Sequence, residues 1–147
     1  MLSVLIIDAK ILDHYSKYND LITQSECIGS MLYHIPFIDK LKMQRVFLNL
    51  INNAIEAIGE NGVINISLEN NENKFILWKI KDSGCGISDE IASRIFEPFV
   101  SGKSNGTGLG MSIVKSFVEK HGGSISVNSK IGEGTEMIIS LPKSVNV

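Results

Sequence analysis

The sequence predicts a two-layer α/β sandwich in which helices pack on one face of a mixed, mostly antiparallel sheet. Two helical patterns with an apolar face, over residues 43–58 and 111–121, supply the helical layer. Two pairs of alternating segments supply the strands, because period-two alternation is typical of half-buried β-strands. The strands are expected at residues 62–69, 74–81, 124–129 and 135–141. With 147 residues, the chain is expected to form a single domain over residues 1–147.

The composition is that of an ordinary globular protein, with 44% hydrophobic and 20% charged residues. Its 14 basic and 16 acidic residues give a net charge of −2, without the broad positive field of a nucleic-acid binder, so we expect no nucleic-acid partner. Cys27 and Cys85 are far apart, which predicts neither a zinc site nor a disulfide framework and favours the reducing cytoplasm. The apolar stretch Val4–Ile7 is far shorter than the roughly 20 residues of a membrane span. We therefore expect no direct span, although a parent protein could be membrane-anchored.

The first third of the chain carries little functional signal. Apolar residues between Val4 and Tyr18 fit helical spacing, and we expect a helix there. The mixed segment Ile22–Leu32 contains serine and glycine and is expected to form a strand and a turn. His14 and His34 are single histidines without partner spacing, so we interpret them as surface or packing residues.

The helix expected at residues 43–58 has the clearest pattern in the chain. Its apolar residues follow i, i+3, i+4, i+7 spacing without a break. Asp39 is the expected N-cap, and Gly59 is the expected stop.

Three asparagines stand on this helix, at positions 49, 52 and 53, although asparagine is a modest helix former. Asn49, Asn53 and Glu56 share one polar stripe, because they are spaced i, i+4 and i+7. The stripe is either a solvated face or a set of amide oxygens that face a cleft, where they can ligate a hard cation such as Mg²⁺.

The two hairpins are predicted from alternation and from the turns between their strands. In the first pair, Ile64 and Ile66 alternate with polar residues, and the turn-rich segment Asn70–Asn73 connects the strands. In the second pair, the glycine-containing segment Ile131–Gly134 makes the connection.

The first hairpin runs directly into Asp82–Ile87, with the sequence DSGCGI. An acidic residue at a strand end, followed by Gly84 and Gly86, suits a tight turn in which the backbone approaches a ligand. A buried carboxylate there can accept a hydrogen bond from an exocyclic amine such as that of adenine. The alternative is an ordinary Asp-Ser-Gly turn.

A short helix is expected at Ser88–Phe96, because serine is a good N-cap. The glycine-rich segment Ser101–Gly110 then opens onto the helix at 111–121, and such a junction favours phosphate because free N–H groups and the helix dipole both attract anions. Two other phosphate motifs fail here. Glu97 stands where a Walker A loop requires glycine, and Met111 stands where a dinucleotide GxGxxG motif requires its last glycine.

Five motifs in a fixed order together resemble the ATP-binding catalytic domain of sensor histidine kinases, within the superfamily that includes DNA gyrase, a heat-shock chaperone and mismatch-repair ATPases. The resemblance covers about residues 39–141 and implies a Bergerat-type ATP-binding fold. The motifs look like the N box NLINNAIEAI at 49–58, the first glycine box DSGCGI at 82–87, the F box FEPF at 96–99, the second glycine box GTGLGMSIV at 106–114 and the final turn GEGT at 132–135.

The resemblance implies that the chain binds ATP and Mg²⁺. Asn53 would hold the metal through its amide oxygen with Asn49 in support, and Lys103 would contact the phosphates; these three are the implied catalytic residues. Asp82 would bind the adenine amine, and Thr135 would lie near this carboxylate and contact it through water. The glycines of the second glycine box would form a lid over the phosphates. The other residues expected at the nucleotide are Gly84, Gly86, Ile87, Gly106, Thr107, Gly108, Leu109 and Gly110.

One position favours a kinase over an ATPase. Hydrolysing members of the superfamily place a glutamate four residues before the metal-binding asparagine, and this chain has Asn49, whose amide cannot act as a general base. Glu56 departs from the basic residue that many sensor kinases carry there. The implied reaction is transfer of the γ-phosphoryl group of ATP to a histidine. The alternatives are an ATP-binding regulator of the anti-sigma kind and a gyrase-type ATPase.

No segment resembles a phosphoacceptor helix, in which a glutamate follows the histidine, because His14 is followed by Tyr15 and His34 by Ile35. We therefore expect the phosphoacceptor and dimerisation helices to be absent from this chain. The expected partners are a histidine-bearing dimerisation domain, on the same parent protein or on another chain, and a downstream response regulator.

Overall fold

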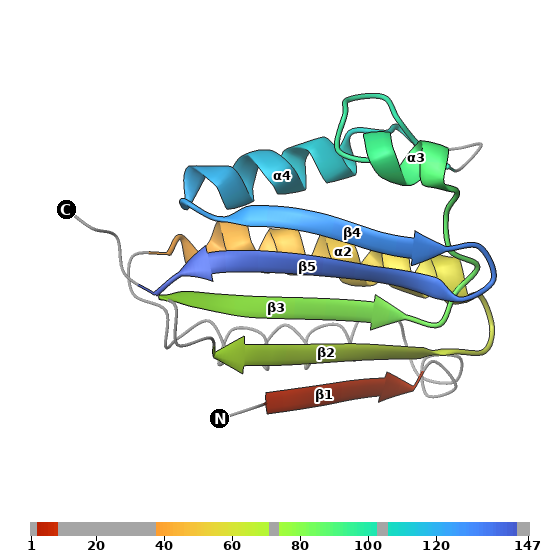
Figure 1. Ribbon diagram of the computed structural model, residues 1–147, viewed down its shortest axis with the longest axis horizontal. Coiled ribbons are helices and arrows are strands. Elements are labelled where there is room, and N and C mark those ends of the chain that lie inside the picture. Colours follow the sequence, from red (N-terminus) through yellow and green to blue (C-terminus); the bar gives the residue numbers. More distant parts are fainter. Residues whose placement is uncertain (1–2, 9–37, 71–73, 103–105, 144–147) are drawn as a thin grey trace.

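The computed structural model describes residues 3–8, 38–70, 74–102 and 106–143. Five strands and three helices follow one another along these residues (Figure 1). They are β1 (Ser3–Asp8), α2 (Lys40–Ile58), β2 (Val63–Asn70), β3 (Phe75–Asp82), α3 (Asp89–Arg94), α4 (Gly110–Lys120), β4 (Ser124–Lys130) and β5 (Gly134–Pro142).

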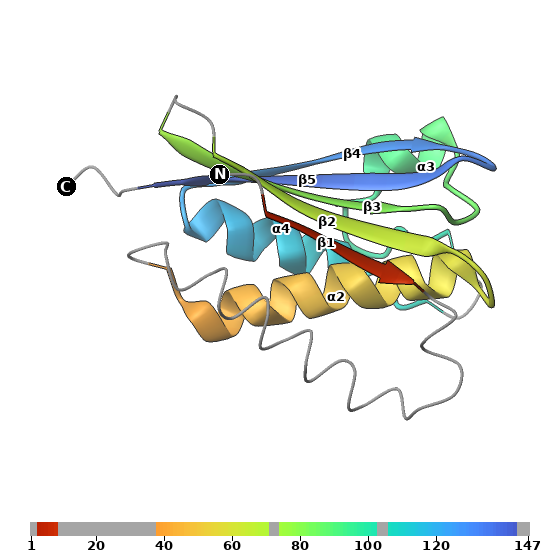
Figure 2. The same ribbon diagram turned by 90° about the horizontal axis from the view of Figure 1, so that it is seen from below.

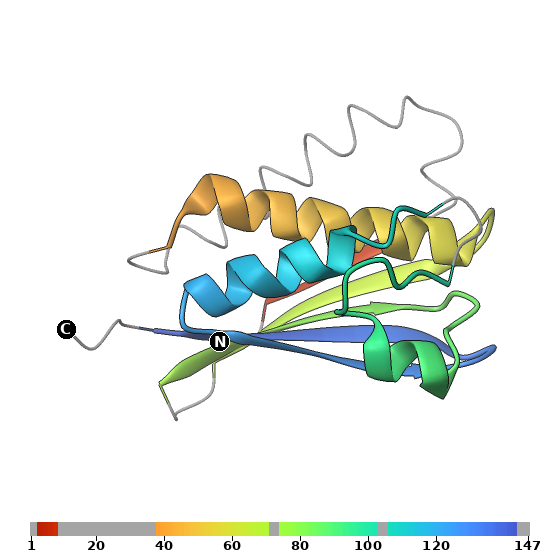
Figure 3. The ribbon, with the colours of Figure 1, turned by 90° about the horizontal axis from the view of Figure 1, so that it is seen from above.

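The strands form one sheet in the order β1-β2-β3-β5-β4. Helices α2 and α4 lie side by side on one face of this sheet, and α3 lies beside β4 at its edge (Figures 2 and 3). The two-layer α/β sandwich is therefore confirmed. Among the described strands every pairing is antiparallel, so the sheet is simpler than the mixed one that was expected. None of the helices in the described ranges combines the length and apolar character that crossing a bilayer requires.

Helix α2 confirms both of its predicted ends and provides much of the core. The Asp39 carboxylate accepts a hydrogen bond from the Lys42 N–H at 3.1 Å, and Gly59 ends the helix with φ = 64°. Its apolar face is buried against the sheet, where the ring of Phe47 packs on that of Trp78 at 4.6 Å between centroids. Helix α2 is thus fixed over β3, the strand that leads to the first glycine box.

The predicted helix over Val4–Tyr18 is wrong for residues 4–8, which belong to strand β1. This strand pairs with β2 from Ser3 opposite Leu68 to Asp8 opposite Val63. The stretch Val-Leu-Ile-Ile is rich in β-branched residues, and pairing with a distant strand outweighs a weak local helical pattern. Residues 9–18, together with the strand and turn expected at Ile22–Leu32 and with His14 and His34, lie outside the described residues.

Helix α4 is fastened to the start of α2 at its C-terminal end. The Asp39 N–H donates to Nε2 of His121 at 3.1 Å, and Nδ1 of the same ring donates to the Phe117 carbonyl at 2.7 Å. The opposite end of α4, which begins at Gly110, faces the polar stripe of α2. The two helices therefore bracket a polar region at one end of the sandwich.

The strand register gathers a row of polar side chains at that end of the sheet. Asp82 on β3 lies opposite Thr135 on β5, which in turn lies opposite Ser129 on β4. Further along the same face, this row is followed by buried apolar residues such as Ile80 and Ile139. The polar row therefore marks where the apolar core ends and the candidate site begins.

Candidate functional site

Asp82 is a buried carboxylate with one oxygen held by the protein. Asp82 is only 6% exposed. Its Oδ1 accepts hydrogen bonds from the Gly84 N–H at 2.8 Å and the Thr135 N–H at 3.3 Å. Burial raises the pKa of the Asp82 carboxyl above its usual range, while these two hydrogen bonds act in the opposite direction. Oδ2 receives no hydrogen bond from the described residues, so it can accept one from a ligand amine.

The glycines of the first glycine box close the turn onto neighbouring backbone. A Cβ atom at Gly84 would lie 2.6 Å from the carbonyl group of Ala57 on α2, and the Cys85 N–H donates to that carbonyl at 3.1 Å. Gly86 has φ = 69°, and a Cβ there would collide with the Lys130 carbonyl. Both glycines therefore join the turn to α2 and to the β4–β5 hairpin, in addition to any role beside a ligand.

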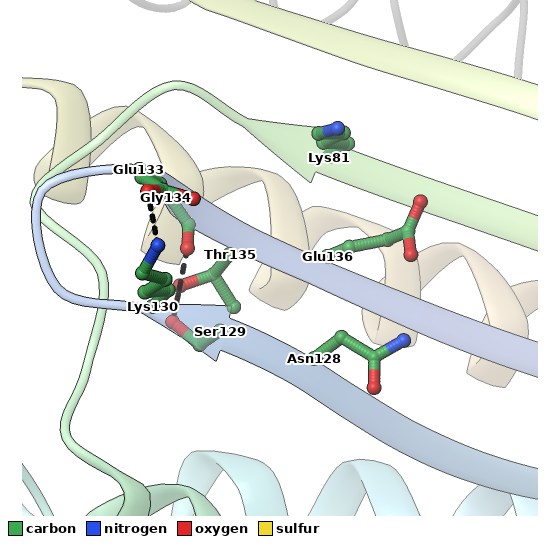
Figure 4. Close-up of a pocket in the computed structure, with 8 residues that line it drawn as sticks. All are labelled: Lys81, Asn128, Ser129, Lys130, Glu133, Gly134, Thr135 and Glu136. Carbon is green, nitrogen blue, oxygen red and sulfur yellow. Dashed lines mark hydrogen bonds and ion pairs between the residues drawn. The ribbon is translucent and has the colours of Figure 1, made fainter.

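Ser129 connects this turn to the β4–β5 hairpin, and the sequence motifs do not include it. Its Oγ accepts a hydrogen bond from the Ile87 N–H at 2.9 Å. The same Oγ donates to the Gly134 carbonyl at 3.0 Å (Figure 4) and lies 2.8 Å from Oγ1 of Thr135. A signal was present in the alternation of β4, which places Ser129 on the same inward face as apolar Val127.

The polar stripe of α2 lies against the start of α4. The Nδ2 group of Asn49 donates to the Gly110 carbonyl at 3.4 Å, and Nδ2 of Asn53 lies 3.9 Å from Sδ of Met111. Both asparagines are half-buried, whereas Asn52 beside them is exposed. Asn53 is also one helical turn before Ala57, which contacts the first glycine box. The stripe thus spans the distance between the two glycine boxes.

The side chains of Asn49 and Asn53 are suited to binding a hard divalent cation. The amide nitrogens of Asn49 and Asn53 are turned toward α4, and each side chain also carries an amide oxygen, a ligand type that suits Mg²⁺. Mg²⁺ in nucleotide sites keeps several waters and uses few protein ligands besides the phosphates. In the described ranges no three His, Cys, Asp or Glu side chains gather as a metal site.

The second glycine box is joined to the F box. The Phe99 N–H donates to the Gly108 carbonyl at 2.9 Å, and Gly108 has φ = 67°. Gly106 and Thr107 are exposed, and Leu109, the N-cap residue of α4, gives its helix no side-chain hydrogen bond. The first N–H groups of α4 are therefore not capped by this side chain, which favours an anion. Lys103 lies outside the described residues.

A shallow polar hollow of about 250 Å³ lies at the β4–β5 hairpin (Figure 4). Most of its lining comes from side chains on the sheet face away from α2 and α4, including Lys81, Asn128 and Glu136. Asp82 and Asn53 do not line it. The hollow is therefore separate from the polar region between the helices and the strand ends, although Ser129 and Thr135 stand at the boundary of both.

The sandwich fold, with its polar site between two helices and the strand ends, is that of a class of ATP-binding domains. The family described as histidine kinase-, DNA gyrase B- and HSP90-like ATPase matches residues 38–145, and the chain belongs to this family. The description of this family names ATPases.

Relatives with similar sequences include sporulation kinases and sensor histidine kinases. The chain is 42% identical to sporulation kinase D of Bacillus subtilis over 104 residues, which are 71% of this chain and 20% of the relative. It is 38% identical to the sensor histidine kinase ZraS of Salmonella typhimurium over 104 residues, 71% of this chain and 22% of that protein. The chain therefore spans about a fifth of the length of these two relatives.

Among solved structures, the catalytic domain of the histidine kinase ThkA matches with a TM-score of 0.66 and 29% identity, over 96% of each chain. The mycobacterial sensor histidine kinase MprB matches with a TM-score of 0.66 and 26% identity, over 95% of this chain and 97% of that chain. The chain thus has the fold of a histidine kinase catalytic domain, as its motifs predicted.

Proposed function

We propose that this chain binds Mg-ATP and transfers the γ-phosphoryl group to a histidine on a separate phosphoacceptor domain. The observation that carries the proposal is Asn49, which lies half-buried against Gly110 at the position where the hydrolysing members have glutamate. An amide cannot take a proton from water, so the γ-phosphoryl group is kept for another acceptor.

The site residues divide into those that hold the base and those that hold the phosphates. Asp82 accepts the adenine amine at Oδ2, with Thr135 beside it. Asn53 and Asn49 hold Mg²⁺ through their amide oxygens, and the metal, when bound, neutralises phosphate charge. The start of α4 and Lys103 bind the phosphate oxygens. The remaining positions of the nucleotide site are Gly84, Gly86, Ile87, Gly106, Thr107, Gly108, Leu109 and Gly110.

The reaction requires orientation more than covalent chemistry by this chain. An imidazole nitrogen of the acceptor attacks the γ-phosphorus, the bond to the β–γ bridging oxygen breaks, and ADP leaves. The chain contributes the alignment of the nucleotide and the stabilisation of phosphate charge. The acceptor histidine comes from a dimerisation domain, on the same parent protein or another chain, and a response regulator receives the phosphoryl group next. We place the reaction in the cytoplasm, consistent with the exposed free thiol of Cys85.

The direct test is phosphoryl transfer in trans. The purified chain is mixed with γ-labelled ATP, Mg²⁺ and a panel of histidine-bearing dimerisation domains. We expect the label on the histidine of at least one domain. Asn53→Ala should weaken Mg-dependent ATP binding about 10- to 100-fold, the range for losing a metal-site contact. Asn52→Ala removes an exposed asparagine from the same helix and should change nothing.

Two outcomes would overturn this proposal. If the chain binds ATP but the label never reaches a histidine, the chain is a nucleotide-binding regulator. If phosphate is released rapidly without an acceptor, and Asn49→Ala abolishes the release, the chain is a gyrase-type ATPase.

A further inference from the structure

We propose that Ser129, which lies outside all five motifs, is a positioning residue that gives the site its preference for adenine over purines with a carbonyl group at C6. It acts by fixing the direction of the proton on the Thr135 hydroxyl. The inference rests on the proposed function, since it requires that Asp82 and Thr135 face the base of a bound nucleotide.

The argument begins with the single proton of Ser129. Its Oγ has three partners: the Ile87 N–H at 2.9 Å, the Gly134 carbonyl at 3.0 Å and Oγ1 of Thr135 at 2.8 Å. A hydroxyl group has one proton and two lone pairs. The carbonyl can only accept, so the Ser129 proton goes to Gly134, and the Ile87 N–H occupies one lone pair. The remaining lone pair must accept the proton of Thr135.

This arrangement satisfies all three bonds at once. If Ser129 donated to Thr135 instead, the Gly134 carbonyl would lose this donor within a buried residue. The Ser129 backbone is also held in place, because it is paired with Thr135 in the β4–β5 ladder, and the next carbonyl, that of Lys130, abuts Gly86. Neither the backbone nor the hydroxyl of Ser129 can therefore be turned without breaking a contact.

The consequence for Thr135 is that its hydroxyl proton points away from the base and toward β4. Its N–H is also committed, because it donates to Oδ1 of Asp82. Thr135 and Asp82 are direct partners across the strands, and both are buried. Together they present only acceptor atoms: Oδ2 of the carboxylate and the lone pairs of Oγ1. Where these acceptors face the substituent at C6, they match the amine of adenine and repel the carbonyl of hypoxanthine or guanine.

The test compares ATP with inosine triphosphate, in which a carbonyl replaces the amine at C6. Dissociation constants of both Mg-nucleotides are measured by calorimetry on the full chain. We expect Ser129→Ala to lower the preference for ATP about 2- to 10-fold, the value of one hydrogen bond, because the released Thr135 hydroxyl can then donate to the carbonyl. Ser129→Thr keeps the hydroxyl and should keep the preference. Ser126→Ala alters an exposed serine on the opposite face of β4 and is the matched control.

A double substitution separates positioning from general structure. If Ser129 acts through Thr135, Ser129→Ala combined with Thr135→Val should show the same preference as Thr135→Val alone. A Ser129→Ala chain that loses affinity for both nucleotides equally would show a merely structural role and overturn the inference. A chain that binds neither nucleotide, even without substitution, would instead refute the proposed function.

Folding of each variant is checked by the fluorescence of Trp78, the single tryptophan of the chain. If Ser129→Ala does not fold, Ser129→Cys replaces it, since a thiol is a weak donor of similar shape. An unchanged nucleotide preference in that variant overturns the inference, and a reduced preference supports it.

Discussion

The two glycine boxes of this site use glycine against different neighbours. In the first, Gly84 and Gly86 pack on the backbone of Ala57 in α2 and of Lys130 in the β4–β5 hairpin. In the second, Gly108 also packs on backbone, that of Phe99 and Val100, but the nearest atoms to a Cβ added at Gly110 all belong to the side chain of Asn49, with Nδ2 at 3.2 Å. Gly84 and Gly86 are therefore closed in by backbone of the regular core, whereas Gly110 at the start of α4 lies against one polar side chain.

This difference teaches where stability and ligand binding can be separated. Backbone that belongs to a sheet or a long helix cannot yield without cost to the whole fold. A side-chain amide can rotate at small cost, but the rotation then moves Asn49, a group of the proposed metal and phosphate site. We expect substitutions of Gly84 and Gly86 to affect folding and substitutions at Gly110 to affect nucleotide binding.

The largest effect is expected for Gly86→Ala. The new methyl group would collide with the Lys130 carbonyl, and φ = 69° is unfavourable for alanine, so the free energy of unfolding should fall by about 3 kcal/mol or more. Gly132→Ala is the control, because φ is 81° there but no atom lies within 4 Å of the added Cβ; it should cost about 1–2 kcal/mol. Urea unfolding followed by Trp78 fluorescence measures both. Equal losses would contradict the close contact at Gly86.

Asp82→Asn should have the next largest effect, on affinity. The amide oxygen can still accept from Gly84 and Thr135, but an N–H donor replaces the oxygen that faces the adenine amine. We expect ATP affinity to fall about 10- to 100-fold, the range for a hydrogen bond to a charged group. Asp89→Asn, at an exposed aspartate that begins α3, should leave affinity unchanged. Calorimetry with Mg-ATP tests the pair, and equal affinities would remove Asp82 from the site.

A smaller effect is expected for Gly110→Ala. Its backbone does not have positive φ, and its nearest neighbour is a rotatable amide, so the free energy of unfolding should change by less than about 1 kcal/mol. Displacement of Asn49 should weaken Mg-ATP binding about 3- to 10-fold. Gly102→Ala, where the nearest atom is a side-chain carbon of Ile91 at 3.5 Å, should change neither. A large loss of stability at Gly110 would abolish the contrast between Gly110 and Gly86.

The smallest effect concerns stability and pH. Because burial raises the Asp82 pKa in the folded state, the ionised group destabilises the fold at neutral pH, and this cost disappears below the usual pKa of 3.8. Without nucleotide, Asp82→Asn should therefore have a higher melting temperature than the parent at pH 7, and the difference should shrink on acidification.

The exposed N-cap Asp39 has its pKa lowered by hydrogen bonds from Lys42, so Asp39→Asn should lose stability at neutral pH and approach the stability of the parent in acid. Melting temperatures between pH 3 and pH 7 give both signs.

Local patterns predicted most of the fold, because short-range periodicity and turn residues indicate α2, α4 and both hairpins. Strand β1 was missed because its partner β2 lies about 60 positions away in register, from Ser3 to Leu68 at one end. The motifs likewise predicted Asp82 and the asparagines. Ser129 could not be found that way, because its importance depends on Ile87, which is 42 positions away.

The hydrogen bond from the Asp39 N–H to His121 couples the C-terminal end of α4 to the start of α2. Helix α4 has 11 residues and is therefore about 16 Å long, with the His121 attachment at its C-terminal end and Gly110 at the other end. A tilt of α4 by about 5° about its C-terminal end would displace the start of the helix by about 1.4 Å, given that length. Such a displacement is enough to break the Asn49–Gly110 hydrogen bond, which is already 3.4 Å long. A movement at the start of α2 would thus be transmitted to Gly110, at the far end of α4.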